Sequence, residues 1–441
     1  MKNDLTRRQF LKRTAGAAGA ATIAPKLLTD PNPIPYSSYV PPSDRVRFGI
    51  IGVGMQGSGL LTNAITLPGI ECVAAADLWD GRHTLAKEIT SKSNLFTTRK
   101  YQQLLDNKEI DCIIAAVPDH WHKRVVVDAT AAEGVAMAEA QKKTGRIVQV
   151  GSQRVSSVIC AKAKEMIATG AIGKLTLVEG SLGRNDPTGA WEYPPPPGLS
   201  LQNFDWDTWQ SGATNRPWDA DMSPKWFARW RCWKEYGTGV AGDLLVHLVS
   251  GMNYMLGWNE PPKRVMALGA IIRFPDGRNM PDVHAALYEY ASAGGAPVYL
   301  RLNLGCENPE TYRFQGSKGI LEVTEFGLAH YPQTGEDSAP SYYTYSYPQA
   351  LREAYFKQWH AEHDPQVGKE PFFENYVYKA NDFDDVRPHL WTFFSSVKSR
   401  KPLTEDAVFG HNAALACHMA NESYFRGAAV TWDAATNTIK S

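Results

Sequence analysis

The sequence predicts a mixed α/β chain in which a doubly wound parallel sheet is followed by a second domain with a sheet of its own. Near the N-terminal end, short apolar runs alternate with helical patterns, and the first run leads into a glycine-rich turn. Between residues 265 and 323, segments of alternating polarity indicate further strands. At 441 residues the chain is too long for one hydrophobic core. We therefore predict a leader and linker over residues 1–43, one domain over 44–153 and another over 154–441.

The composition excludes some partners and leaves others open. Lys plus Arg and Asp plus Glu are balanced at 46 each, so neither nucleic acid nor an acidic membrane surface is indicated as a partner. The 13 Trp and 19 Tyr are compatible with sugar stacking or with ordinary core packing. The 6 Cys form no C-x-x-C pair, so we expect neither a disulfide framework nor a zinc or other metal site.

The N-terminus resembles an export signal. Residues 6–12 read Thr-Arg-Arg-Gln-Phe-Leu-Lys, and a weakly apolar run follows over residues 14–24. Paired arginines before a mildly hydrophobic stretch are typical of the twin-arginine signal, which a receptor reads and which is no anchor. The alternative is a disordered basic tail. We expect a periplasmic protein that is exported folded, without a membrane anchor.

The glycine-rich turn predicts a dinucleotide site. A buried strand over residues 46–53 runs into Gly52-Val53-Gly54-Met55-Gln56-Gly57, and a helical stretch follows. In this G-x-G-x-x-G pattern the first glycine permits the turn and the second lets the backbone approach a pyrophosphate. The third allows the helix to pack closely on the strand, and the helix N-terminus stabilises the phosphate charge. The strand, turn and helix together predict a Rossmann domain.

A carboxylate follows the next strand at the position expected for ribose binding. Residues 71–76 form an apolar run that ends at Asp77. A carboxylate there accepts hydrogen bonds from both ribose hydroxyls and repels a 2′-phosphate, so NAD is favoured. Arg82 lies close enough in sequence to leave NADP possible, and a helix N-cap is the alternative role for Asp77.

The third strand, over residues 111–117, ends in the turn Pro118-Asp119-His120-Trp121-His122. Ligands bind at the carboxyl ends of strands in a doubly wound sheet. We therefore expect Pro118, His120, Trp121 and His122 to line the nicotinamide side of the cofactor site. A capping role for His120 and a surface position for His122 are the alternatives.

An acid/base pair is predicted in the second half of the chain. Asp243 and His247 are four residues apart in a helical pattern, so both should project from one face. A carboxylate one turn before an imidazole orients the ring and raises its proton affinity, which suits proton transfer with a hydroxyl. From these residues alone, a surface pair or a core histidine is an equal alternative.

These motifs together resemble the glucose–fructose oxidoreductase, inositol dehydrogenase and rhizopine-catabolism family (Gfo/Idh/MocA). The resemblance extends from about residue 45 to the C-terminus. It also rests on the Gly-Thr-Gly-Val-Ala-Gly-Asp-Leu-Leu-Val-His stretch over residues 237–247 and on residues 400–407. It implies a C-terminal α+β domain with a large, open, mainly antiparallel sheet, and His247 and Asp243 as catalytic residues. It also implies NAD(P)-dependent chemistry on a sugar or polyol hydroxyl, and a homo-oligomer formed through that sheet.

One family motif is absent. The family carries a Glu-Lys-Pro tripeptide at the end of the next strand, whose lysine holds the reacting hydroxyl. Here residues 122–143 read as one helix that runs into a strand over 146–151, so a strand and a helical turn are missing near Ala132-Glu133. Lys123, Arg154 and Lys174 are the candidate replacement cations.

The sequence thus leaves three function classes open. The first is an NAD(P)-dependent sugar oxidoreductase, the second a glycosidase that oxidises its sugar transiently, and the third a sugar- or nucleotide-binding protein without redox chemistry. Several basic and aromatic side chains are candidate substrate contacts, with domain packing as their alternative role: Arg154, Trp230, Arg231 and Tyr236.

Overall fold

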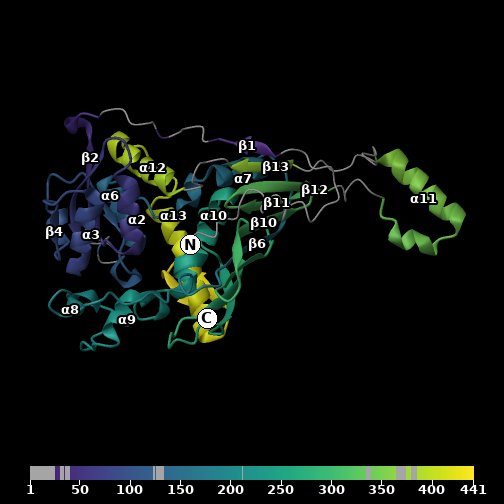
Figure 1. The fold of residues 1–441 in the computed structure, drawn as a ribbon. Helices are drawn as coiled ribbons and strands as arrows, with labels where there is room; N and C mark the ends of the chain where they lie inside the picture. Colours follow the sequence, from purple (N-terminus) through teal and green to yellow (C-terminus); the bar gives the residue numbers. More distant parts are fainter. Residues whose placement is uncertain are drawn as a thin grey trace.

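The fold consists of two sheets with helices packed against them (Figure 1). The computed structural model describes residues 25–29, 34, 40–122, 125, 134–210, 212–333, 339–363, 374–378 and 385–441. The predicted export signal, the candidate cation Lys123 and the centre of the helix predicted over residues 122–143 lie outside the described residues.

The N-terminal sheet is parallel and has the strand order β4-β3-β2-β5. Its strands are β2 (Val46–Ile51), β3 (Ile70–Ala76), β4 (Phe96–Thr98) and β5 (Cys112–Ala115). Helices α2 (Met55–Ala64), α3 (Asp80–Thr90) and α4 (Gln102–Leu105) connect them. The chain passes from β2 through β3 to β4 and then returns to the other side of β2, so the strand order reverses between β2 and β5. Such a switch point is where doubly wound sheets bind their ligands, and the predicted Rossmann fold is confirmed.

The second sheet has 11 strands in the order β1-β13-β12-β11-β10-β6-β9-β8-β7-β14-β15. Its pairs are antiparallel except β1 with β13 and β6 with β9, which confirms the large, mainly antiparallel sheet. The strands are β1 (Lys26–Leu28), β6 (Leu175–Gly183), β7 (Arg264–Ala270), β8 (Val283–Glu289), β9 (Val298–Asn303), β10 (Asn308–Gly316), β11 (Gly319–Thr324), β12 (Gly327–Pro332), β13 (Glu374–Tyr378), β14 (Val430–Asp433) and β15 (Thr438–Lys440).

Helices cover one face of this sheet and leave side chains of the other face exposed. Helices α7 (Val158–Ala168), α10 (Val246–Leu256) and α13 (Ala407–Arg426) pack together and contact β11, β10 and β7. On the strands β7 and β8, Met266, Leu268 and Leu287 are exposed, and Met266 pairs directly with Leu287. Helix α11 (Gln349–Glu362) stands away from both sheets (Figure 1).

Helix α12 (Val386–Ser399) joins the two halves. It belongs to the C-terminal part of the chain, but its buried Leu390 and Phe394 pack into the core of the parallel sheet. The ring of Phe394 lies 5.5 Å from that of Phe48 on β2. The nucleotide-binding half therefore completes its core with a helix from outside the predicted range 44–153.

The tryptophan-rich segment between β6 and α10 is a packed layer. Helices α8 (Trp206–Gln210) and α9 (Ser223–Ala228) lie beside the Rossmann half (Figure 1). The rings of Trp206 and Trp209 stack 5.2 Å apart. The backbones of Trp79 and Phe204 form an isolated antiparallel β-bridge between the two halves. In these positions the tryptophans serve packing.

The strand predicted over residues 146–151 is wrong. This stretch is no strand; within the described residues its one backbone link to another segment runs from Val150 N–H to the Glu405 carbonyl, at 3.1 Å. The described parallel sheet ends at β5, so the stretch has no neighbouring strand with which to pair. Helix α6 (Gly134–Thr144) precedes it, as the helical pattern predicts.

Candidate active site

The glycine turn has the geometry of a phosphate cradle. Gly52 has φ +86°, and a Cβ there would lie 2.3 Å from the Ala116 carbonyl oxygen. A Cβ on Gly57 would lie 2.0 Å from the Gly52 carbonyl oxygen, so the helix approaches the strand as closely as glycine permits. Within the described residues no side chain caps the first turn of α2, and its residues Met55 and Gln56 are exposed. The backbone N–H groups there are free to bind an anion.

Asp77, the predicted ribose ligand, is held by backbone hydrogen bonds. It is 8% exposed, and its Oδ2 accepts a hydrogen bond from Val53 N at 2.9 Å while its Oδ1 accepts one from Trp79 N at 3.0 Å. Arg82 Nη1 lies 3.3 Å from Oδ2. Arg82 also borders the glycine turn, because a Cβ on Gly54 would lie 3.2 Å from Arg82 Nη2. A carboxylate and a cation therefore stand side by side at the predicted ribose end of the site.

Hydrogen bonds connect the turn after β5 to the C-terminal half. Asp119 Oδ2 accepts hydrogen bonds from Thr238 N at 2.8 Å and from Thr238 Oγ1 at 2.5 Å. The two ring nitrogens of His120 face the carbonyl oxygens of Tyr236 and Trp209, at 3.0 and 2.8 Å. These bonds join the predicted nicotinamide end to the residues immediately before the acid/base helix.

Two predicted cofactor contacts in this turn are therefore wrong. His120 has no ring nitrogen left for a ligand, and Trp121 is buried, with its Nε1 donating to the Trp209 carbonyl at 2.6 Å. Both side chains anchor the turn. Pro118 begins the same turn and His122 is exposed, so cofactor contact for these two residues stays a prediction.

Asp243 and His247 do not form the predicted pair. Residues Ala241–Leu245 form a π-helical turn before α10, and this wider turn changes the direction in which Asp243 projects. Asp243 Oδ1 instead accepts a hydrogen bond from Arg231 Nε at 2.5 Å. The Arg231 guanidinium lies 4.1 Å from the centre of the Trp230 ring. Asp243 therefore orients Arg231 rather than the imidazole.

His247 stands on a buried polar network that the sequence analysis missed. Tyr312 donates to the His247 carbonyl oxygen at 3.0 Å and lies 2.8 Å from Glu310 Oε1. Glu310 in turn accepts two hydrogen bonds from Arg154, from Nε at 2.7 Å and from Nη2 at 2.5 Å. Glu310 and Tyr312 share the strand β10, whereas Arg154 and His247 lie on helical segments far away in the sequence. Packing of α10 against β10 brings the network together, and no local spacing links the helices to this strand.

The environment keeps the His247 imidazole neutral. Burial lowers the pKa of His247 below its usual value, and the nearby charge of Arg154 lowers it further. Nδ1 is buried and has no hydrogen-bond partner among the described residues. A neutral imidazole near pH 7 can accept a proton from a hydroxyl group.

Two predicted substrate contacts are contradicted. Arg154 is ion-paired with Glu310 and lies 3.5 Å from Asp385, so its guanidinium is occupied beneath α10. Tyr236 is fully buried, and its hydroxyl lies 2.9 Å from Thr214 Oγ1. Trp230 and Arg231 are half-buried beside Asp243, and their contact with substrate stays a prediction.

Of the other replacement cations, Lys174 is exposed at the turn beside Ser317. In the part of the chain that the structure describes, no cluster of His, Cys, Asp or Glu could hold a metal ion.

Comparison with known proteins identifies the family. Residues 46–152 match the model described as oxidoreductase family, NAD-binding Rossmann fold, and residues 210–322 match the GFO/IDH/MocA C-terminal domain. The chain belongs to the Gfo/Idh/MocA family. The N-terminal half of this family member is accordingly an NAD-binding Rossmann domain.

Its curated relatives are matched over part of their length. A glycosyl hydrolase family 109 protein of Parabacteroides distasonis is 31% identical over 137 residues, which cover 28% of this chain and 29% of that protein. Inositol 2-dehydrogenase of Salmonella typhimurium is 30% identical over 155 residues, which cover 31% and 45%. The chain thus spans less than half the length of these relatives. Levoglucosan dehydrogenase in complex with NADH and levoglucosan has the same fold, with a TM-score of 0.62 and 16% identity over 88% of this chain and 99% of that one.

The residues of this Gfo/Idh/MocA chain fit NAD. The uncapped first turn of α2 and the two glycines that admit no Cβ leave room for a pyrophosphate. Asp77 Oδ2 accepts from Val53 N and Arg82 Nη1, whereas Oδ1 accepts only from Trp79 N among the described residues and retains a lone pair for a ribose hydroxyl.

Proposed function

We propose that this protein is an NAD-dependent oxidoreductase that transfers a hydride between the carbinol carbon of a sugar or polyol and nicotinamide. The observation that carries the proposal is the connection of the two halves by Asp119 and Thr238. Through these bonds the turn after β5 contacts Thr238, which lies a few residues before the helix that carries His247. The curated inositol dehydrogenase and the fold of levoglucosan dehydrogenase support a sugar-like substrate.

The chain's own residues supply the proton chemistry. Bound NAD supplies the hydride acceptor. Neutral His247 takes the hydroxyl proton of the substrate as the carbon is oxidised, and it returns the proton in the reverse direction. Asp243 and Trp230 hold Arg231 so that its remaining N–H groups can bind substrate hydroxyls.

The lack of the Glu-Lys-Pro segment bears on this activity. The charged groups with the largest effect on the pKa of His247 are Arg154, Glu310, Asp243 and Arg184, and none of these is a lysine. Oxidation of a hydroxyl without a lysine to hold it should be slow. If the purified protein is inactive, the result would therefore favour a sugar- or nucleotide-binding protein without turnover.

A second candidate function is favoured by one observation, the match to a glycosyl hydrolase family 109 protein. In that case the sugar is oxidised transiently, the aglycone is eliminated, and the hydride returns to the sugar. The two functions differ in the fate of the hydride: an oxidoreductase accumulates NADH in proportion to product, whereas such a glycosidase releases aglycone without net NADH.

The experiment has two stages. Purified, nucleotide-stripped protein is titrated with NADH and with NADPH by fluorescence, and NADH is expected to bind more tightly. A panel of polyols, aldoses and nitrophenyl glycosides is then assayed for NADH and for nitrophenol, with His247→Ala as the control. Removal of the acid/base group should lower turnover by about a hundredfold or more. Nucleotide binding without any turnover in the panel would overturn the enzymatic proposal and favour a binding protein.

We also propose that the protein acts in the periplasm after twin-arginine export. No helix in the described parts of the chain has the length and apolar character to cross a membrane. A reporter fused to residues 1–40 should be exported, and the double change Arg7→Lys with Arg8→Lys should block that export. A reporter that stays in the cytoplasm, or export that survives the double change, would contradict the proposal.

The exposed face of the large sheet is our proposed surface for a homo-oligomer. Leu268 is 69% exposed and stands next to the pair of Met266 and Leu287. Leu268→Glu should shift the mass measured by light scattering from oligomer to monomer. Leu201→Glu is the matched control, because Leu201 is also an exposed leucine but lies outside the sheet. An oligomer that survives Leu268→Glu would refute this surface.

A further inference from the structure

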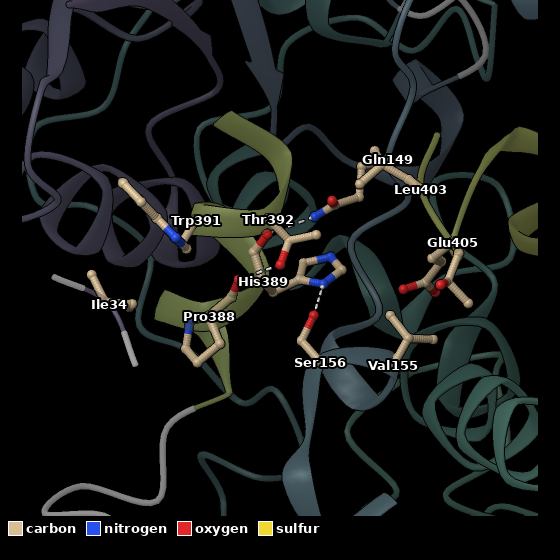
Figure 2. A pocket seen from close by; sticks show the side chains of 11 residues that line it. Ile34, Gln149, Val155, Ser156, Pro388, His389, Trp391, Thr392, Leu403 and Glu405 are labelled. Carbon is tan, nitrogen blue, oxygen red and sulfur yellow. Dashed lines mark hydrogen bonds between the residues drawn. The ribbon is translucent and has the colours of Figure 1, made fainter. Parts of the chain in front are cut away.

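A cavity of about 210 Å³ lies outside the candidate active site (Figure 2). It is bordered by residues 149–156, by helix α12 and by the residues 403–405 that precede α13. Apolar walls come from Val155, Trp391 and Leu403. An apolar cavity of about 150 Å³ holds a benzene molecule, so this space can take a compact ligand.

One wall of the cavity carries a buried carboxyl group without a partner. Glu405 is 1% exposed, and neither of its carboxyl oxygens has a hydrogen-bond partner among the described residues. Ser152 is its polar neighbour, and its hydroxyl and N–H lie close enough to oppose in part the rise that burial causes in the pKa of Glu405. The Ser152 hydroxyl is, however, bonded to Ser250 Oγ, and the Ser152 N–H donates to the Val150 carbonyl at 3.0 Å. Figure 2 shows the Glu405 carboxyl turned toward the side of His389 and Val155.

The neighbouring polar groups are already engaged. His389 Nε2 lies 3.0 Å from the Val150 carbonyl oxygen, and Nδ1 lies 3.0 Å from Ser156 Oγ. Gln149 Nε2 donates to the His389 carbonyl at 2.9 Å. The imidazole therefore has no free nitrogen with which to satisfy Glu405. A buried polar group left unpaired is costly, and it identifies the position where a ligand atom would be stabilised.

We propose that this cavity binds a small primary ammonium compound with a short apolar body, and that Glu405 holds the ammonium group. Ammonium offers three N–H donors and no acceptor, which matches a carboxylate whose neighbouring donors on Ser152 are bonded elsewhere. Val155 and Leu403 cover the apolar part of the ligand.

Binding of an ammonium ion should release a proton, whereas binding of a neutral ligand should not. Burial raises the pKa of Glu405 to about 9, so the carboxyl group of the empty cavity is protonated at neutral pH. An arriving ammonium ion keeps its own protons and favours the carboxylate. Glu405 therefore loses its proton to the buffer, and no other bond is formed or broken. At pH 7 about one proton should be released for each ligand bound.

The test is calorimetric titration of the full chain with n-butylammonium chloride, with the neutral isostere n-butanol as the second probe. Each titration is run at pH 7 in two buffers that differ in ionisation enthalpy, which gives the number of protons released. We expect saturable butylammonium binding with release of about one proton, and no comparable binding of butanol.

Two variants complete the test. Glu405→Gln keeps the shape and hydrogen-bonding capacity of the side chain but removes its charge, and it should weaken butylammonium binding by about tenfold or more. Glu165→Gln removes an exposed carboxylate on α7 and should leave binding unchanged. No butylammonium binding, equal binding of butanol, or unchanged binding to a folded Glu405→Gln protein would each overturn the proposal. If Glu405→Gln fails to fold, the number of protons released when butylammonium binds the unaltered protein still tests the proposal.

Discussion

The two halves of the molecule differ in how completely each closes its own core. The C-terminal half has an 11-stranded sheet, and its buried side chains form one continuous cluster. Among the described residues the nucleotide-binding half has four strands, and its buried side chains fall into two smaller clusters on opposite faces of the sheet. One of these clusters includes Leu390 and Phe394 from α12. The cofactor half therefore depends on the C-terminal half for both stability and orientation.

This difference has a consequence for function. The hydrogen bonds of Asp119 and the two carbonyl contacts of His120 cross between the halves at the proposed site of hydride transfer. Because α12 of the C-terminal half packs into the core of the nucleotide-binding half, a bound nucleotide is held in a fixed position relative to the C-terminal half. The first two predictions below test whether the halves differ in stability, and the last two test the nucleotide site of the dependent half.

Phe394→Ala should have the largest effect on the nucleotide-binding half. The ring is 1% exposed and packs on Phe48, so its removal should cost about 3–5 kcal/mol of unfolding free energy. Urea denaturation should show an early transition that coincides with loss of NADH binding. Phe314→Ala in the core of the large sheet is the matched control and should lower the other transition. A single unfolding transition shifted equally by both variants would contradict the inferred difference in stability between the two halves.

Acidification should weaken both halves through one buried histidine in each. Burial lowers the pKa of His389, on α12, and of His284, on β8, to about 4. An unfolded chain takes up these protons near pH 6.5, whereas the folded chain does so only near pH 4. Stability is therefore full above about pH 6.5 and is lost as the pH falls toward 4, by at most roughly 3 kcal/mol for each histidine.

The measurement is urea denaturation at pH 7 and pH 4.5. His389→Gln should flatten the pH dependence of the transition linked to NADH binding, and His284→Gln should flatten that of the sheet half. If His389→Gln leaves the acid sensitivity of the NADH-linked transition unchanged, the coupling inferred for α12 is wrong.

The same contrast explains what the sequence could predict. The glycine turn, Asp77 and the strand ends of the Rossmann half follow from local patterns, and the antiparallel sheet follows from alternation together with the family resemblance. The partner of Asp243 could not be predicted, because spacing assumes an α-helix and the π-helical turn at Ala241–Leu245 redirects the side chain. The support of His247 by Glu310 and Tyr312 depends on the packing of α10 against the distant strand β10, which no local pattern encodes. The strand predicted over residues 146–151 failed because apolar alternation cannot show that a pairing partner is absent.

Two glycines of α2 separate the binding geometry from helix stability. Gly57→Ala forces a Cβ against the Gly52 carbonyl oxygen, so it should weaken NADH binding by about tenfold or more, which corresponds to at least about 1.4 kcal/mol. Gly59→Ala is the matched control, because no atom lies within 4 Å of its added Cβ. This control should stabilise the helix by up to about 1 kcal/mol and keep NADH binding. Equal affinity for NADH in both variants would show that the glycine turn does not bind the nucleotide.

Arg82→Ala should have the smallest effect and the most specific one. Arg82 lies 3.3 Å from Asp77 and borders Gly54, so it neutralises part of the charge that would repel a 2′-phosphate. Its guanidinium also lies 4.6 Å from the ring of Phe227, which holds it at the ribose end. Removing a partly exposed ion pair changes affinities by at most about 1 kcal/mol. NADPH binding should therefore weaken a few-fold while NADH binding is kept or improved, as measured by fluorescence titration of both nucleotides against Arg82→Ala and the unaltered protein. If NADPH binds equally to both proteins, Asp77 alone sets the preference for NAD, and Arg82 serves only to pack α3 against α9.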